Sequence, residues 1–156
     1  MKLADIIVPQ AVVPELSATD RNGVIRELVA ALESAGRVAT GEGADVAKEV
    51  IKRENQATTG FGKGVAIPHV KHACVTNVVA ALGRTPAGVD FSALDRAPVY
   101  TVILLISPTD KPDQHLQAME NIFRHLQHDN FRKFLRQAST REEILDLLRE
   151  ADEMPR

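Results

Sequence analysis

The stretch from Tyr100 to Ile106 constrains the fold more than any other part of the sequence. It reads Tyr-Thr-Val-Ile-Leu-Leu-Ile, so both faces of a strand formed there are largely apolar. A strand that is apolar on both faces is typical of the middle of a sheet that is covered on each side. The rest of the chain must therefore supply neighbouring strands and helices that cover them.

Other segments have the composition of strands. Val75 to Leu82 predicts a second strand, and residues 88–91 (Gly-Val-Asp-Phe) predict a short piece at an edge. Residues 11–16 predict only a short or edge strand, because Pro14 lacks the N–H that a central strand donates.

The helices are predicted from apolar residues spaced three and four apart. The first is capped by Thr19 or Asp20 and ends near Gly36, and the second covers about 44–55. Later helices begin near Asp113, at 130 and at Thr140, which opens a capping box, and residues 151–156 are predicted to fray. The predicted inward residues are Val24, Ile25, Leu28, Val29, Leu32, Val46, Ala47, Val50, Ile51, Leu116, Met119, Ile122, Phe123, Leu126, Phe131, Phe134, Leu135, Ile144, Leu147 and Leu148.

This order of elements predicts an α/β or mixed α+β fold, in which helices flank a central sheet. The 156 residues suit a single domain over 1–156 with one core. A net charge of −2 without a basic block makes nucleic acid an unexpected partner. The single cysteine, Cys74, excludes an internal disulfide, and no apolar run is long enough to cross a bilayer. We therefore expect a cytoplasmic protein.

The glycine-rich segment 58–69 runs from Thr-Thr-Gly-Phe-Gly-Lys-Gly into Val-Ala-Ile-Pro-His. Gly60, Gly62 and Gly64 can adopt backbone angles that turn several N–H groups, together with that of Thr59, toward one anion. The same glycines are also compatible with a plain tight turn, since the segment lacks the spacing of nucleotide-binding loops.

The segment ends at His69. Pro68 fixes its own φ and keeps Ile67 extended, so we expect His69 to stand at the end of a short apolar strand. A histidine in such a place is more often an ordinary half-buried residue than a reactive one. A second feature is needed to decide.

The helix that begins near Asp113 supplies that feature. At about 100° per residue, His115 lies within about 60° of the inward residues Met119 and Ile122, in the first turn. His128 points the opposite way and His125 lies on the flank. Free N–H groups and the helix dipole disfavour imidazolium at a helix N-terminus, so we expect a neutral His115 that donates a hydrogen bond. The alternative is a boundary histidine packed over the core.

Arg53 lies in the last turn of the second helix, on the edge of its buried face. A solvated charge, or a counter-charge to the helix C-terminus, is the commoner role of such an arginine. Cys74 is predicted to be a buried small residue, and Lys71 and His72 a solvated edge.

The chain resembles the fructose/mannitol class of enzyme IIA domains of the bacterial phosphoenolpyruvate-dependent phosphotransferase system. The resemblance is carried by Arg53-Glu54, by Thr59 through His69 and by His115-Leu116, and residues 86–91 and 131–143 also look like that family. It covers nearly the whole chain. It implies a mixed sheet flanked by helices.

The resemblance implies that His69 accepts a phosphoryl group, that His115 lies opposite it, and that Arg53 holds the anion or meets the partner. Turn amides at Thr59, Gly60, Gly62 and Gly64 would share the phosphate charge. The implied donor is an HPr-like phosphocarrier protein, and no cofactor is expected.

One position departs from the family pattern: Val70 follows His69 where a small residue is usual. Together with Phe61 it is expected at an apolar edge where a carrier protein docks.

Several alternatives stay open. The nitrogen-regulatory subtype is favoured by the freestanding length and the opening sequence. The others are a sugar-transport component that passes phosphate to a IIB partner, a non-catalytic binding module whose site Val70 has damaged, and a metal site formed by His69, His72 and Cys74.

Overall fold

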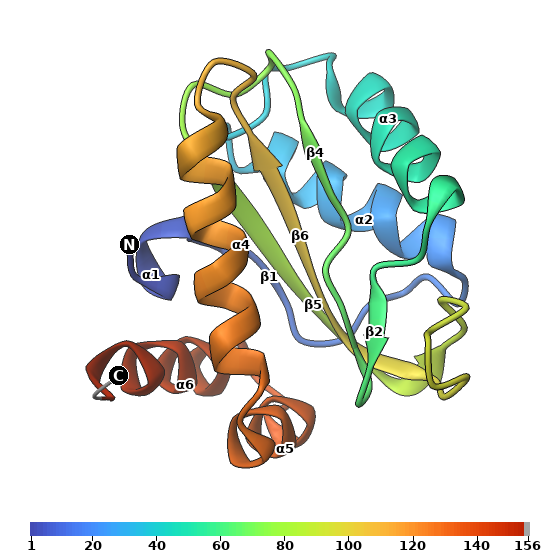
Figure 1. Ribbon diagram of the computed structural model, residues 1–156, viewed down its shortest axis with the longest axis vertical. Helices are drawn as coiled ribbons and strands as arrows, with labels where there is room; N and C mark the ends of the chain where they lie inside the picture. Colours follow the sequence, from blue (N-terminus) through green and yellow to red (C-terminus); the bar gives the residue numbers. More distant parts are fainter. Residues whose placement is uncertain (155–156) are drawn as a thin grey trace.

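A mixed sheet runs through the computed structural model, which describes residues 1–154 (Figure 1). In chain order the elements are α1 (Leu3–Ile6), β1 (Ile7–Val13), α2 (Arg21–Ser34), α3 (Gly43–Gln56), β2 (Gly60–Gly62), β3 (Val65–Ala66), β4 (His69–Lys71), β5 (Val79–Val89), β6 (Val99–Ser107), α4 (Pro112–Leu126), α5 (Asp129–Gln137) and α6 (Arg141–Glu153). The strand order is β1-β5-β6-β3-β2, and β4 also pairs with β6. β5 with β6 and β2 with β3 are antiparallel, whereas the other pairs are parallel.

The central strand is β6, as its composition predicts. It pairs with β5 along one side and with β3 and β4 along the other, and all its residues except Tyr100 are buried. Its even-numbered residues Val102, Leu104 and Ile106 pack with the helices of one face, while Ile103 and Leu105 pack with those of the other. The alternation follows from the period of two along a strand.

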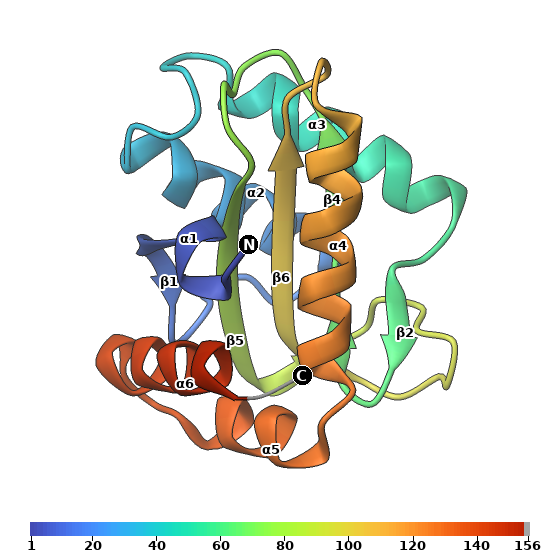
Figure 2. The same ribbon diagram turned by 60° about the vertical axis from the view of Figure 1, so that its left-hand side comes forward.

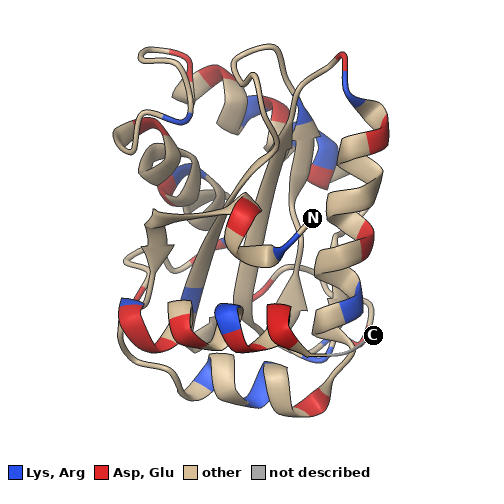
Figure 3. Ribbon diagram, turned by 90° about the vertical axis from the view of Figure 1, so that its left-hand side faces the viewer, with Lys and Arg blue, Asp and Glu red and all other residues tan. Residues whose placement is uncertain are grey.

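Helices cover both faces of the sheet, which confirms the predicted fold class. α2 and α3 lie on one face, and α1, α4, α5 and α6 lie on the other (Figures 1 and 2). Charged residues of both signs lie along α5 and α6, while the strands behind these helices carry few charged residues (Figure 3). Within residues 1–154 no helix is long and apolar enough to cross a bilayer.

Two strands differ from their predictions. β1 begins at Ile7 rather than 11 and ends before Pro14, and it is an edge strand with Pro9 inside it. An edge strand tolerates a proline because one side of its backbone forms no sheet hydrogen bonds. β5 starts at Val79 and continues to Val89, so the piece predicted over 88–91 is partly the end of this strand.

α4 is rotated relative to the predicted inward face. Leu116 and Phe123 are 59% and 42% exposed, whereas Ala118 and His125 are buried. Leu116 and Phe123 lie roughly 150° around the helix from Ala118, so they cannot share its buried face. The prediction was wrong here because it centred the face on the largest apolar side chains. In α5 likewise, Leu135 is buried but Phe134 is 47% exposed.

The end of α6 is bonded to α1, which sequence patterns did not predict. The carboxylate of Asp152 accepts hydrogen bonds from the N–H groups of Leu3 (2.7 Å) and Ala4 (2.9 Å). α6 therefore stays helical to Glu153, and fraying from 151 was a wrong prediction; residues 155–156 lie outside the described part.

Candidate functional site

A break in strand pairing positions His69. β3 ends at Ala66, and β4 begins at His69 itself. Pro68 has no N–H to donate, although its carbonyl accepts a hydrogen bond from the N–H of Leu105 (2.9 Å). The sequence predicted that His69 would end the first strand. Instead, His69 begins a second strand, β4, which pairs with β6. Pairing on both sides of the break leaves its backbone little freedom.

The ring of His69 has a defined tautomer. Its Nδ1 lies 2.8 Å from the carbonyl oxygen of Ile67, which can only accept, so Nδ1 carries the proton and Nε2 a lone pair. Burial lowers the pKa of His69 below its ordinary value, and the charge of Arg53 adds to this, while the hydrogen bond to Ile67 opposes it. At neutral pH the ring is uncharged and its Nε2 is nucleophilic.

His115 lies in the first turn of α4, as predicted, although the helix begins at Pro112, after Lys111 rather than at Asp113. Its Nδ1 lies 2.6 Å from the hydroxyl of Ser107 at the end of β6. Burial lowers the pKa of His115 to about 4, with smaller contributions from His69 and from the charge of Lys71. The lowered pKa agrees with the expected neutral imidazole, although its main cause is burial and not the helix N-terminus from which that expectation was argued.

The structure brings the two predicted histidines together. The ring centroids of His69 and His115 are 5.5 Å apart, and the ring planes are inclined by 49°. β4 and the first turn of α4 stand at the same end of β6 (Figure 1). Both rings are partly buried, so an anion placed between them would meet two neutral imidazoles rather than bulk water.

Arg53 and Glu54, at the end of α3, border this pair. Nη1 of Arg53 donates to the carbonyl of Ala57 (2.9 Å), and its charge is close enough to lower the pKa of His69. Glu54 is 2% exposed, and its carboxylate accepts from the N–H and the hydroxyl of Thr59, both at 2.7 Å.

A chain of hydrogen bonds leads from Glu54 to the reactive ring. The carbonyl of Thr59 accepts from the N–H of Ile67 (3.3 Å), and the carbonyl of Ile67 holds His69. No role for Glu54 was predicted from the sequence. The helical spacing could have indicated that Glu54 is buried, since it stands four residues after Val50 on the buried face of α3.

Gly62 and Gly64 are not brought to the histidines. The carbonyl of Gly64 accepts from the N–H groups of Tyr100 and Thr101, near the start of β6, whereas His115 meets Ser107 at its end. Six residues of strand correspond to about 20 Å. The positive φ angles of Gly62 (107°) and Gly64 (78°) make this a tight turn, the plainer of the two readings.

The turn amides are largely committed to other partners. The N–H of Lys63 donates to Asp95, that of Gly60 to the hydroxyl of Thr58, and that of Thr59 to Glu54. The predicted concavity of N–H groups around an anion is therefore not formed by these three amides. Thr59 and Gly60 border the histidine segment as part of its support.

Val70 differs from its predicted place at a docking edge. Its side chain packs with the cluster under α2 and α3, on the opposite face of the sheet from Phe61. Neighbouring strand residues point to opposite faces, so Val70 is directed away from the face that carries α4. It does not narrow the approach to His69.

In the part of the chain that the structure describes, the ligand atoms of His69, His72 and Cys74 do not gather within 4.8 Å of one another. Nε2 of His72 lies 2.8 Å from the carboxylate of Asp45, and Nδ1 of His72 accepts from the N–H of Cys74 (3.0 Å). Glu42, Asp45 and His72 present their ligand atoms within 4.8 Å of one another. An Nδ1 that accepts a hydrogen bond leaves the proton on Nε2, where a metal would need the lone pair. Burial also raises the pKa of the partly buried Cys74 thiol.

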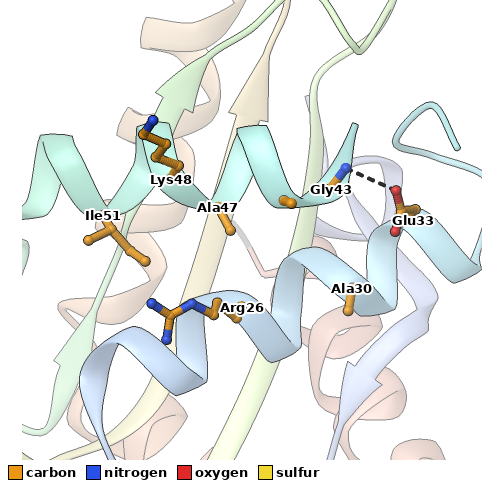
Figure 4. A pocket seen from close by; sticks show the side chains of 8 residues that line it. Arg26, Ala30, Glu33, Gly43, Ala47, Lys48 and Ile51 are labelled. Carbon is orange, nitrogen blue, oxygen red and sulfur yellow. Dashed lines mark hydrogen bonds between the residues drawn. The ribbon is translucent and has the colours of Figure 1, made fainter. Parts of the chain in front are cut away.

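Two cavities lie away from the histidine pair. One of about 420 Å³ lies between α2 and α3, where Ala47 and Ile51 face Arg26 and Ala30, and the N–H of Gly43 donates to Glu33 (Figure 4). Another of about 640 Å³ is lined by residues that include Gly64, Tyr100 and Arg136, near the glycine turn. Neither is lined by His69 or His115.

The sequence is similar to one protein family and to individual proteins whose names include EIIA components and nitrogen regulatory proteins. The family described as "Phosphoenolpyruvate-dependent sugar phosphotransferase system, EIIA 2" matches residues 5–151. The PTS system fructose-specific EIIABC component of Bacillus subtilis (strain 168) is 30% identical over 152 residues, which are 97% of this chain and 24% of that protein. The nitrogen regulatory protein of Bradyrhizobium diazoefficiens is 31% identical over 149 residues, 95% of each.

A solved structure is also similar over almost its whole length. The crystal structure of nitrogen regulatory protein IIA-Ntr from Neisseria meningitidis superposes with a TM-score of 0.84 and 28% identity, covering 94% of this chain and 98% of that one. The chain spans about a quarter of the B. subtilis protein and most of the other two. This chain therefore belongs to the EIIA 2 family of the phosphoenolpyruvate-dependent sugar phosphotransferase system, whose EIIA domains are phosphotransfer components.

Proposed function

We propose that Nε2 of His69 accepts a phosphoryl group from a phosphohistidine carrier protein of the HPr type. The observation that carries this proposal is the pairing of His69 with a second neutral imidazole, that of His115, at 5.5 Å between ring centroids. The hydrogen bond to Ile67 supports the assignment of Nε2, since it leaves the lone pair on that nitrogen.

The reaction exchanges one N–P bond for another. The lone pair on Nε2 of His69 attacks phosphorus, the bond from phosphorus to the carrier's ring nitrogen breaks, and its electron pair stays on that nitrogen. Nδ1 of His69 keeps its proton, which the carbonyl of Ile67 continues to accept. Such a transfer passes through a loose transition state, with negative charge spread over the three equatorial oxygens.

Stabilising that charge is the role we assign to the neighbours of His69. A neutral His115 supplies an N–H, and Arg53 supplies a positive charge that already acts on the ring of His69. Glu54 and Thr59 hold the backbone that carries Ile67, so they position the acceptor rather than the phosphate.

An exposed apolar patch beside the histidines fits a protein partner. Leu116 and Phe123 are its exposed members, at 59% and 42%, while Phe61 and Met119 are half-buried beside them; the rings of Phe61 and Phe123 lie 4.6 Å apart. Transient protein interfaces have an apolar centre with a polar surround. A small anionic substrate would not need such a surface, so the patch supports phosphoryl transfer from a carrier protein.

The experiment is incubation with phosphorylated HPr, followed by intact-protein mass spectrometry. Wild type should gain one phosphoryl group, His69→Ala should gain none, and His128→Ala, which removes an exposed histidine, should be labelled like wild type. Uptake by His69→Ala equal to that of wild type would contradict the proposal. Absence of label from any carrier would favour a binding module that has the fold without the transfer.

We further propose that the phosphorylation state acts as a regulatory signal in the cytoplasm, as in a nitrogen-regulatory IIA protein. The superposition on the N. meningitidis protein supports this. The 30% identity with the B. subtilis fructose component supports the second candidate, transfer onward to a IIB partner in sugar uptake. Mixing the labelled protein with purified fructose or mannitol IIB distinguishes the two, because only a transport component loses its label rapidly.

A further inference from the structure

Ser107 is a buried serine whose hydroxyl contacts the ring of His115. It is the last residue of β6, its exposure is 0%, and its Oγ lies 2.6 Å from Nδ1 of His115. Its backbone carbonyl is occupied by the N–H of His72 (2.8 Å). In the described part of the chain its hydroxyl forms no other hydrogen bond.

The direction of this hydrogen bond follows from the needs of the hydroxyl. A serine O–H that is cut off from water needs an acceptor, and an unpaired buried donor costs about 1–3 kcal/mol. Nδ1 of His115 is the acceptor within reach. If Nδ1 instead carried the proton, Ser107 would become the acceptor and its own O–H would have no partner.

We propose that Ser107 is a positioning residue that donates its proton to Nδ1 of His115 and so holds the ring as the Nε2–H tautomer. The inference rests on the proposed phosphoryl transfer and deepens it. It assigns the two histidines opposite tautomers, with the proton on Nδ1 in His69 and on Nε2 in His115.

Opposite tautomers suit opposite tasks. Nε2 of His69 must present a lone pair to phosphorus, whereas Nε2 of His115 must present a proton to a phosphoryl oxygen. Each assignment is fixed from behind by the other ring nitrogen, through the Ile67 carbonyl in one ring and the Ser107 hydroxyl in the other. A lone pair on Nε2 of His115 would instead face the negative oxygens.

The Ile67 carbonyl and the Ser107 hydroxyl differ in whether they can donate a hydrogen bond. A backbone carbonyl only accepts, so it places the proton on the neighbouring nitrogen of His69, while a hydroxyl with no other acceptor donates and removes the proton from that nitrogen of His115. The low pKa of His115, about 4, keeps the ring in its neutral form at pH 7, so that a single tautomer can be assigned.

The test is the long-range ¹H–¹⁵N spectrum of the histidine rings at pH 7, recorded on the whole protein. In wild type, Nδ1 of His115 should have the shift of an unprotonated nitrogen and Nε2 that of a protonated one, with the reverse in His69. Ser107→Ala should give His115 a measurable Nδ1–H fraction and slow uptake from phosphorylated HPr by roughly three- to tenfold. Ser107→Thr, which keeps the hydroxyl, should restore the tautomer.

The matched control is Thr101→Val. Thr101 is also buried and lies on β6 facing the same side, six positions before Ser107, so it reports the cost of losing a buried hydroxyl far from the histidines. This variant should leave both ring spectra and the transfer rate unchanged.

The ring spectrum of wild type needs no phosphoryl donor, so it decides the inference even if no carrier labels the protein. A protonated Nδ1 in wild-type His115 overturns the inference, and so does a Ser107→Ala variant with an unchanged spectrum. Failure of labelling with the predicted spectrum would overturn the proposed function and leave the tautomer assignment standing.

Discussion

The carboxylate of Glu54 accepts two hydrogen bonds from Thr59, one from its N–H and one from its hydroxyl, each at 2.7 Å. Glu54 is almost completely buried and lies in the last turn of α3, next to Arg53. Its carboxylate is therefore part of the support of the segment that reaches Ile67 and His69.

Glu54→Ala should lower the free energy of unfolding by about 2–4 kcal/mol, because it leaves the N–H and the hydroxyl of Thr59 without an acceptor. Glu54→Gln keeps one acceptor oxygen and should cost less. Urea unfolding followed by circular dichroism measures both. Glu120→Ala, which removes an exposed glutamate of α4, is the control and should change the value by less than about 0.5 kcal/mol. Equal losses for Glu54→Ala and the control would show that the two bonds contribute little.

Acid should destabilise the protein through its histidines. Folding lowers the pKa of His115 from 6.5 to about 4, and that of His69 is lowered too, so between these values the unfolded state binds more protons than the folded state. Stability then rises with pH and is lost as the pH falls from about 6.5 toward 4. Urea midpoints across this range measure the slope, and His115→Gln should reduce it. If the slope were unchanged in His115→Gln, the pH dependence of stability would not come from His115.

His115→Ala should still be phosphorylated on His69, but about 10- to 100-fold more slowly, because one donor to the transition-state oxygens is lost. Quenched-flow mixing with phosphorylated HPr gives the rate. The matched control is Gln114→Ala, an exposed neighbour in the same helical turn. Rates that agree within twofold would remove His115 from the transfer step.

Leu116→Asp should weaken docking of the carrier without harming the fold, since the side chain is largely exposed. The expected result is a rise in the KM for phosphorylated HPr of roughly tenfold, with a smaller change in kcat. Phe134→Asp alters a comparably exposed apolar residue on α5 and should leave KM unchanged. If the two variants behave alike, the patch around Phe61 and Phe123 is not the docking surface.

The core layers were predictable because they depend on local periodicity. The run from Tyr100 to Ile106 is apolar on both faces and became the central strand, and the spacing of Val24 to Leu32 gave a helix that buries those residues. The Asp20 and Thr140 caps were also predicted, and both side chains accept the expected N–H, from Gly23 and Glu143. Such contacts lie within one turn of the chain.

The errors arose where a residue's surroundings come from distant segments. The orientation of α4, which exposes Leu116 and buries His125, is set by what the helix packs against. The glycine turn was expected beside His69, yet its register on β6 places Gly64 by Thr101. Val70 was assigned to the docking edge, and strand alternation directed it to the other face.

Apolar spacing was enough to predict a sheet covered by helices, and the proline before His69 and the helical position of His115 were enough to make them candidate reactive residues, because such patterns act between near neighbours in the chain. The distance of 5.5 Å between the two rings, and the hydrogen bonds of Ile67, Ser107 and Glu54 around them, are known only from the folded chain. The protonation and orientation of a buried imidazole depend on which donors and acceptors folding places against it, and these come from strands and helices that are far apart in the sequence.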